Sequence, residues 1–536
     1  MEKKSKSLKT IENNTSYYGC AFFLREDKKY KIDGCVFENC SFRTGVTFNR
    51  IEKSKFINCN FSNKFCLDLS YAKIAELPKE IFQLTSLTHL DLQNVGIKDF
   101  PKEIKKLTSL THLDLTRNFE RKEFPKEILQ LTSLTHLNLT NVQIKELPKE
   151  IERLSSLTHL NLSGTKITEL LKEIGQISSL IHLYLSRTEI TKLPKKIDQL
   201  SSLTHLDLSR TKIKKLPKET FQLTSLTYLN LSGTEITELP KEITQLSSLV
   251  RLDLSWTKIK KLPKEIGQLS SLADLNLSGT EISELPKEIE PLSSLIRLDL
   301  SRTKIKEVTQ GIIQLSCLTH LNLNNTEITE LPREIGQLSF LTHLYLSYTK
   351  ITELPKEIGQ ISSLTHLNLS KTKITELPKE ITQLSFLVYL DLSETKIKKL
   401  SKEIEQLSSL KIIMRNMIPF DISNLHPDFI RAMNNLQYNP NAERYYEIFS
   451  GGLVWADERP NSPKEFFNLE KGGSINRYLL AYRSSLIRGT PMKKFQHIWD
   501  DLHKMYPHWL IFRSERSSTE HLQFLLELQE SVMRDL

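Results

Sequence analysis

Nine histidines stand at one equivalent position of a repeated segment, and imidazole can bind a metal ion, hold an anion or take up a proton near neutral pH. If the repeats stack as neighbouring strands, successive rings lie about 5 Å apart, close enough for two of them to share a metal ion or an anion. We expect neutral stacked imidazoles that duplication has copied. As a second hypothesis, protonation of the set would place like charges side by side and change conformation or binding below about pH 6. The nine are His89, His112, His136, His159, His182, His205, His320, His343 and His366.

Other groupings of reactive residues are weaker as sites. His497 and Asp501 lie one helical turn apart, with Asp500 and His503 beside them, but a polar helix surface explains this set better than a metal site does. The sequence contains no glycine-rich phosphate loop, no HExxH and no CxxC. The chain after Cys317 has no cysteine, which excludes a cysteine nucleophile there. We therefore expect no catalytic residues, no cofactor and no metal, and predict that the protein is not an enzyme.

The elements that position the histidines belong to a repeat. Fourteen consecutive segments, the first starting at Leu87 and the last at Leu387, follow the pattern LxxLxLxxxxIxxLPxxIxxLxx. In one of them, Leu203, Leu206 and Leu208 bracket a short strand whose alternate side chains point inward. Proline then opens a helical turn, where its missing N–H is harmless. Leucines therefore line the inside of a coil, and the histidine position faces outward from the strand.

This pattern resembles the leucine-rich repeat family, in the 23-residue form with Leu-Pro-x-x-Ile that occurs in bacterial arrays and eukaryotic Ras-pathway scaffolds. The resemblance covers residues 67–415. It implies an α/β solenoid with a curved parallel sheet on its concave face and a protein partner bound there. The commonest form of the family has asparagine after the strand, bonding the backbone of neighbouring coils. Here eleven consecutive repeats carry threonine, from Thr165 to Thr395. Since a hydroxyl donates one such bond, we expect a weaker ladder.

A shorter rhythm precedes the array. Phe37 and Phe42 are five residues apart, as are Phe56 and Phe61, with a small residue two positions before each. This spacing resembles the pentapeptide-repeat family, which implies a short β-coil with aromatic rings stacked inside. We expect residues 17–66 to cap the first leucine coil and share its core, and residues 1–16 to be a disordered basic N-terminus. The cysteines of this region, at positions 20, 35, 40, 59 and 66, suit buried reduced thiols, with a secreted disulfide cap as the alternative.

The composition changes after the array. Residues 416–536 contain Trp455, Trp499 and Trp509, three helix-start signals and two apolar stripes at helical spacing. At about 120 residues such a segment can hold its own core. We predict a small, mainly α C-terminal domain that resembles no family we recognise.

The row of histidines is interrupted in four consecutive repeats, which makes this part of the array distinctive. The substitutes are tyrosine, arginine and aspartate, and a tryptophan and a further arginine stand at nearby strand ends. Exposed Trp, Tyr and Arg anchor protein interfaces most often, because each offers a large contact area and a polar group. Our hypothesis is that six residues form the centre of a partner site, with random divergence among repeats as the alternative. They are Tyr228, Arg251, Trp256, Asp274, Arg297 and Arg302.

Charge and hydropathy restrict the partners. The net charge of +10 is spread through solvated Lys/Glu pairs, which predicts no nucleic-acid partner. No run approaches 18 apolar residues and the opening residues lack a secretory stretch, so we expect no membrane partner. The sequence favours a cytoplasmic protein–protein interaction scaffold, or a bacterial protein delivered to a host cell. The alternative function is an effector or enzyme with its activity in 416–536. Partner identity and oligomeric state stay open.

Overall fold

A computed structural model describes residues 1–413 except 62–63, 73, 75–76, 78, 98–99, 119–122 and 408–409. The chain divides into two compact units. The first comprises residues 1–292 and 302–304, and the second comprises residues 293–301 and the chain from 305 onward. The predicted helical domain at 416–536, with its tryptophans and the His497–Asp501 pair, lies outside the described residues.

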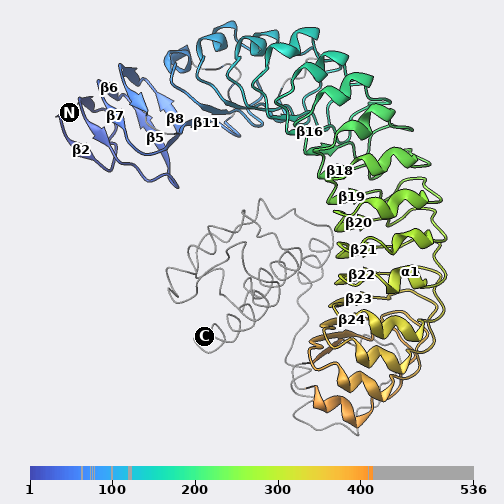
Figure 1. Cartoon of the computed structure of the whole chain (residues 1–536). Helices are drawn as coiled ribbons and strands as arrows, with labels where there is room; N and C mark the ends of the chain where they lie inside the picture. The colour runs from blue at the N-terminus through green and yellow to red at the C-terminus, as the bar shows by residue number, and fades with distance from the viewer. Residues whose placement is uncertain are drawn as a thin grey trace. The chain divides into compact units, whose positions relative to one another are not determined.

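The first unit opens with a short β-coil made of two parallel sheets (Figure 1). Between them, Tyr17 stacks on Phe37 with ring centroids 5.0 Å apart, and Phe37 stacks on Phe56 at 4.8 Å. A second column of phenylalanines runs beside the first. The five-residue rhythm thus places its aromatic residues inside. One sheet is β1 (Glu2–Lys4), β3 (Ser16–Tyr18), β6 (Val36–Glu38) and β9 (Lys55–Ile57), and the other is β2 (Ser7–Leu8), β4 (Ala21–Phe22), β7 (Ser41–Phe42) and β10 (Asn60–Phe61).

The expectation that residues 1–16 are disordered is wrong. Strand β1 pairs in parallel with β3, and β2 pairs with β4, so the coil already begins at the first residues. The ammonium of Lys3 lies 2.7 Å from the carboxylate of Glu12. This stretch lacks the small-residue and aromatic spacing of the coil, but backbone pairing does not require that spacing, and the next coil supplies a ready edge.

Cysteines of the coil act as hydrogen-bond donors. The thiols of Cys40 and Cys59 each donate to a backbone carbonyl of the preceding coil, of Tyr17 and Phe37 respectively, at 3.4 Å. All six cysteines of the chain are free. Burial raises the pKa of the Cys35 thiol, which keeps it protonated and able to donate.

One long strand joins the coil to the leucine array. Strand β8 (Val46–Glu52) pairs with β5 (Lys29–Asp33) on one side and with β11 (Phe65–Asp68) on the other. The ring of Phe65 continues the aromatic column, with centroids 3.8 Å from Phe61 and 6.0 Å from Phe48. The two kinds of coil therefore share one core.

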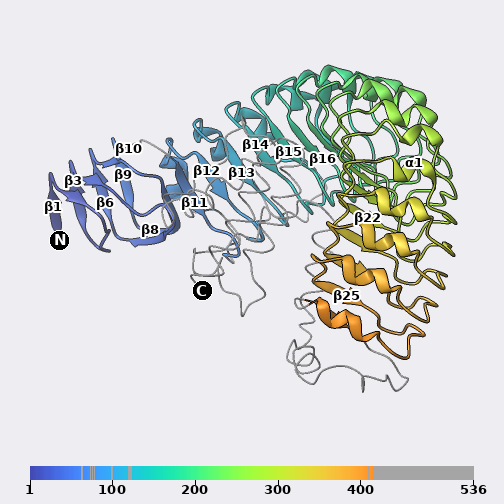
Figure 2. The same cartoon turned by 60° about the horizontal axis from the view of Figure 1, so that its bottom comes forward.

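The leucine array of the first unit is a parallel sheet of short strands. Each strand pairs in register with the next, so equivalent residues of successive coils lie side by side. Figure 1 shows the strands along the inner side of this unit's bend, and Figure 2 shows β12 to β16 next to one another. They are β11 (Phe65–Asp68), β12 (His89–Asp91), β13 (His112–Asp114), β14 (His136–Asn138), β15 (His159–Asn161), β16 (His182–Tyr184), β17 (His205–Asp207), β18 (Tyr228–Asn230), β19 (Arg251–Asp253) and β20 (Asp274–Asn276).

The second unit repeats the same coil. Its strands also pair in register, for example Arg297 with His320. The strands are β21 (Arg297–Asp299), β22 (His320–Asn322), β23 (His343–Tyr345), β24 (His366–Asn368), β25 (Tyr389–Asp391) and β26 (Lys411–Ile413). In both units the repeated leucines and isoleucines are buried, which confirms the predicted solenoid of α/β class.

The return segment of each coil is a short helical turn of 3₁₀ type, which suits pieces of one turn. One α-helix occurs among the described residues, α1 (Gln310–Ile313), in a coil where Thr309 replaces the usual proline. The 3₁₀ turns are η1 (Lys79–Gln83), η2 (Lys102–Lys106), η3 (Lys126–Gln130), η4 (Lys149–Arg153), η5 (Lys172–Gln176), η6 (Lys195–Gln199), η7 (Lys218–Gln222), η8 (Lys241–Gln245), η9 (Lys264–Gln268), η10 (Lys287–Ile289), η11 (Arg333–Gln337), η12 (Lys356–Gln360), η13 (Lys379–Gln383) and η14 (Lys402–Gln406).

The threonines after the strands do not bond neighbouring coils, contrary to expectation. Thr211 donates to the carbonyl of Leu208 in its own coil at 2.7 Å, and Thr165, Thr188, Thr234 and Thr257 make the same bond. The threonine side chain is too short for its hydroxyl to reach the preceding coil. Asn118, at the equivalent position, does reach it: its Oδ1 accepts the N–H groups of Val95 at 3.2 Å and Gly96 at 3.0 Å.

Replacing Asn118 with threonine should therefore destabilise the fold. The buried N–H of Val95 would lose its partner, at a cost of about 1–3 kcal/mol. Urea unfolding followed by circular dichroism measures the change. Thr211→Ser keeps a hydroxyl donor and is the matched control, with an expected change of less than about 1 kcal/mol. Equal unfolding midpoints for N118T and the wild type would contradict the bridging role.

Candidate functional site

Three of the four residues that interrupt the row of histidines lie on neighbouring strands of the first unit. Tyr228, Arg251 and Asp274 pair in register on β18, β19 and β20. The guanidinium carbon of Arg251 lies 5.4 Å from the centroid of the Tyr228 ring, and its Nε lies 3.7 Å from a carboxylate oxygen of Asp274. The arginine therefore has an aromatic neighbour on one side and an anionic one on the other.

This triad is not an exposed anchor. Arg251 is 9% exposed and Asp274 is 8% exposed, so the sequence-based expectation that they present their charges to a partner is wrong. Burial raises the pKa of Tyr228 to about 12, so its hydroxyl stays protonated. Charged side chains that lie in register on neighbouring strands contact one another, and together they form a fixed surface.

Trp256 is the exposed feature of this region. Its side chain is 58% exposed, and its indole covers Gly279, where a Cβ would lie 2.7 Å from the indole Cδ2. The guanidinium carbon of Arg302 lies 5.6 Å from the indole centroid, a cation–π arrangement. Trp256, Gly279 and Arg302 occupy the same position of three successive coils, and we call these three residues the indole platform.

The backbone at Trp256 is strained. Its φ is 58°, in the left-handed region that disfavours a bulky side chain. The neighbouring coils place Gly233 and Gly279 at the same position, with φ of 65° and 67°. These coils therefore require a left-handed backbone conformation at this position, and glycine adopts it at lower energy than tryptophan does.

The six predicted residues thus fall into three groups. Tyr228, Arg251 and Asp274 form the buried triad, and Trp256 and Arg302 belong to the indole platform. Arg297 lies in the second unit, on β21. Sequence reasoning missed Gly279, although a signal was present: Ser-Gly-Thr stands at positions 278–280 where the preceding repeat has Ser-Trp-Thr.

The histidines stack as expected. We call His89, His112, His136, His159, His182 and His205 the first histidine column. Successive ring centroids in it are 3.9, 4.0, 3.9, 4.1 and 4.3 Å apart. His320, His343 and His366 form a second column, at 4.2 and 4.3 Å.

The hypothesis that the histidines become protonated below about pH 6 places that response at too high a pH. Burial is the largest cause that lowers the pKa of His89, His159 and His182 to about 4 and that of His112 to about 3, and the charge that a neighbouring side chain carries when protonated contributes to the same values. The folded protein keeps these imidazoles neutral well below pH 6, because the stacked rings shield one another from water. Neutral stacking is therefore the state of the column at physiological pH.

The comparisons with known proteins agree with this architecture. A family profile described as "Leucine-rich repeat region" matches residues 55–143, 222–276, 316–370 and 356–438. A solved leucine-rich repeat protein of Leptospira interrogans is 38% identical over 70% of this chain and 94% of its own, with a TM-score of 0.63. This chain belongs to the leucine-rich repeat family.

More distant members share the leucine-rich repeat fold. The functional domain of InlJ from Listeria monocytogenes, which includes a cysteine ladder, is 29% identical over 62% of this chain and 69% of its own, with a TM-score of 0.51. The plant peptide hormone receptor RGFR1, solved in complex with RGF2, is 23% identical over 75% of this chain and 70% of its own, with a TM-score of 0.52. No curated protein sequence matches the chain.

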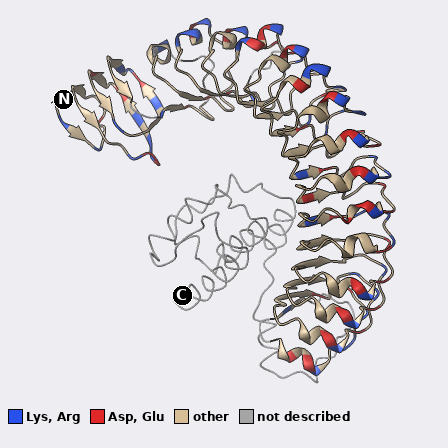
Figure 3. Ribbon diagram, in the orientation of Figure 1, with Lys and Arg blue, Asp and Glu red and all other residues tan. Residues whose placement is uncertain are grey.

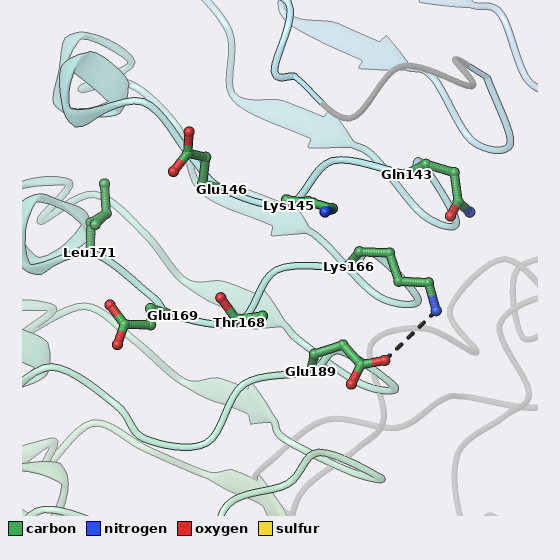
Figure 4. A pocket seen from close by; sticks show the side chains of 8 residues that line it. All are labelled: Gln143, Lys145, Glu146, Lys166, Thr168, Glu169, Leu171 and Glu189. Atoms are coloured by element: carbon green, nitrogen blue, oxygen red, sulfur yellow. Dashed lines mark ion pairs between the residues drawn. The ribbon is translucent and has the colours of Figure 1, made fainter.

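The edges of the leucine-rich repeat coils carry alternating charges. A shallow depression of about 640 Å³ lies there (Figure 4), and the Lys166 ammonium is 3.7 Å from the Glu189 carboxylate, which also pairs with Lys212. Exposed pairs of this kind contribute little individually but match one coil to the next. The lining shows no catalytic arrangement. It consists of Gln143, Lys145, Glu146, Lys166, Thr168, Glu169, Leu171 and Glu189.

Charge is distributed unequally over the leucine-rich repeats. Figure 3 shows Lys, Arg, Asp and Glu residues on the 3₁₀ turns. In the part of the chain that the structure describes, no three His, Cys, Asp or Glu side chains gather as a metal ion would require. Within those same ranges, no helix has the length and apolar character needed to cross a bilayer.

The depressed histidine pKa values predict a pH-dependent stability. The unfolded imidazole has a pKa near 6.5 and the folded His112 a pKa of about 3, so the unfolded chain binds more protons between these values. Stability is then fully present above about pH 6.5 and is lost as pH falls below it. His112→Phe keeps a ring in the stack but cannot titrate. Its unfolding free energy should fall less steeply than that of the wild type between pH 6.5 and 4.5 in urea titrations, and parallel curves would contradict the assignment.

Proposed function

We propose that this leucine-rich repeat protein is a non-enzymatic scaffold that binds a protein partner on its inner sheet face, with the indole platform as the anchor. Leucine-rich repeat relatives commonly mediate protein–protein interaction. The observation that carries the proposal is Trp256, which is held across Gly279 beside Arg302 while 58% of its side chain stays exposed. Trp and Arg are the residues most enriched among interface hot spots.

The energetics of position 256 support a binding role. A left-handed conformation costs a residue with a Cβ about 1–2 kcal/mol, and exposure of a large indole adds a further cost. Glycine in the adjacent coils shows that the fold does not require tryptophan there. Strained, exposed aromatic residues are typical of sites where a partner supplies the compensating contact.

The surface around the platform is already fixed. The triad of Tyr228, Arg251 and Asp274 lies on consecutive strands, whose backbone pairing leaves little freedom. A partner therefore meets a pre-formed sheet and loses little free energy in ordering it. We assign the triad a positioning role, since its charges already contact each other.

The proposal includes a reducing compartment, with a cytoplasmic protein as the first choice and a bacterial protein delivered to a host cell as the alternative. Thiols that donate to backbone carbonyls, as those of Cys40 and Cys59 do, favour reduced cysteines. The bacterial relatives at 38% and 29% identity support a bacterial origin.

Trp256→Gly tests the anchor without harming the fold. Glycine is the natural residue at this position in the adjacent coils, so the melting temperature should change little. A partner that co-purifies with the wild-type full-length chain should bind the variant about tenfold more weakly or worse, because loss of a hot-spot aromatic costs roughly 2 kcal/mol or more. Isothermal titration calorimetry with the purified partner gives the affinities.

Tyr71→Gly is the matched control. Tyr71 is 59% exposed and also left-handed, with a φ of 61°, but it lies at the start of the array. A second variant, Gly279→Asn, displaces the indole by the contact described above and should weaken binding with Trp256 still present. Unchanged affinity in both W256G and G279N would remove the platform from the proposal.

A further inference from the structure

The threonine before each histidine determines how the imidazole is protonated. In the first histidine column, Thr111, Thr135 and Thr158 each donate their hydroxyl hydrogen to a threonine carbonyl of the preceding coil, at 3.0, 3.1 and 2.9 Å. Each of these hydroxyl oxygens also lies 2.9 Å from Nδ1 of the following histidine. A hydroxyl has one hydrogen; when that hydrogen is donated to the carbonyl, the oxygen accepts the second bond and Nδ1 carries the proton.

The outer nitrogen is then an acceptor. With Nδ1 protonated and the ring neutral, Nε2 has a lone pair and no hydrogen. Nε2 is the ring nitrogen farther from the backbone. The coil of His182 shows the dependence on threonine: residue 181 is isoleucine, and Nδ1 of His182 is buried without a hydrogen-bond partner among the described residues.

Parallel rings do not suit a shared metal ion. Two nitrogens on one tetrahedral zinc ion lie at most about 3.4 Å apart, given bonds of about 2.05 Å, and their lone pairs must converge. The rings of His89, His112, His136 and His159 are 3.9 to 4.0 Å apart and tilted by only 13°. Their lone pairs run side by side, and each therefore takes its own hydrogen-bond donor.

Carboxylates continue the acceptor surface. Asp68, Asp91 and Asp114 lie two residues after the histidine position on β11, β12 and β13, and they pair in register. Burial raises the pKa of Asp91 and the carboxylates of Asp114 and Asp68 also raise it, while the hydrogen bond from the Gln93 N–H and the charge of Lys29 act in the opposite direction. Among the described residues, no cation forms an ion pair with Asp91 or Asp114. A cation beside them would relieve their mutual repulsion.

The fold itself provides an example of the donor that this surface takes. The ammonium of Lys29, on β5, forms an ion pair and hydrogen bond with the carboxylate of Asp68 at the start of the column. Asp91 and Asp114 repeat that carboxylate in the next two coils, where no such lysine follows. The position of Lys29 thus indicates how a basic side chain from another molecule would approach.

We propose that the first histidine column and the adjoining Asp91 and Asp114 bind a lysine- or arginine-rich segment of a protein partner. This inference rests on the proposed protein-binding role of the inner face and gives that partner a chemistry. The basic side chains donate to the row of Nε2 atoms and to the carboxylates. From His89 to His205 the column spans five strand spacings, about 24 Å, which matches an extended segment of about seven residues.

A fluorescent heptalysine peptide tests the proposal by anisotropy at pH 7 with the full-length protein, against a heptaglutamate peptide. The chain carries a net charge of +10, so non-specific attraction favours the glutamate peptide. A preference for heptalysine therefore reports the acceptor surface. Preference for heptaglutamate, or no binding of heptalysine, would overturn the proposal.

Two variants separate the contributions. The first variant keeps stacked rings but removes three Nε2 acceptors, and it combines His112→Phe, His136→Phe and His159→Phe. The second variant removes the negative charge, and it combines Asp91→Asn and Asp114→Asn. Each should weaken heptalysine binding about tenfold, with melting curves as the check on folding. The matched control is the same phenylalanine substitution at His320, His343 and His366, where His343 and His366 are buried. Equal affinity in the variants and the wild type would contradict the inference.

The tautomer has its own measurement. Nitrogen-15 NMR of the imidazoles should show protonated Nδ1 and bare Nε2 for His112, His136 and His159, and protonated Nε2 would overturn the inference even if a variant fails to fold. If W256G and G279N keep the wild-type affinity for the partner while the wild type binds heptalysine, the platform anchor alone fails. If the wild type does not bind heptalysine while W256G weakens partner binding, the basic-segment inference alone fails.

Discussion

Because each coil of this array repeats the position of the one before, every side chain has its own counterparts in the adjacent coils as its nearest neighbours. Strand spacing sets that distance near 4.8 Å. A residue is therefore acceptable only if it tolerates a copy of itself, or a chosen complement, at close range. Leucine tolerates itself, because packed methyl groups gain from contact. Histidine does so only when neutral, which explains why burial and the stack together depress the pKa of His112.

Charged residues meet the same constraint by alternation. Lys166, Glu189 and Lys212 follow one another at one coil position, so each has an opposite charge beside it. The buried triad applies this rule where the row of histidines is interrupted: Arg251 has Tyr228 on one side and Asp274 on the other. Asp91 and Asp114 break the rule, since like charges lie in neighbouring coils there. Such an unbalanced place is where a partner's charge has the most to contribute.

The sequence predicted what depends on period alone. The solenoid, its inner sheet, its leucine core and the stacking of histidines follow from which residues recur at which interval. What failed depends on reach and geometry within the coil. Thr211 is too short to bridge coils, whereas Asn118 is long enough. The burial of Arg251 could not be foreseen either, because it requires knowing that a guanidinium lies between two in-register neighbours.

Departures from the repeat differ in what they cost the fold. A substitution that completes an ion pair, as Asp274 does beside Arg251, is stabilised by contacts within the protein and needs no partner to explain it. Trp256 is only partly compensated by contacts within the protein. Arg302 covers one region of the indole, but the backbone strain and the exposed surface remain. Glycine occupies the same position in the two coils that flank Trp256, so an uncompensated tryptophan there is best explained by contacts outside the chain. The same distinction separates Lys29, which satisfies Asp68 internally, from the acceptors of the following coils.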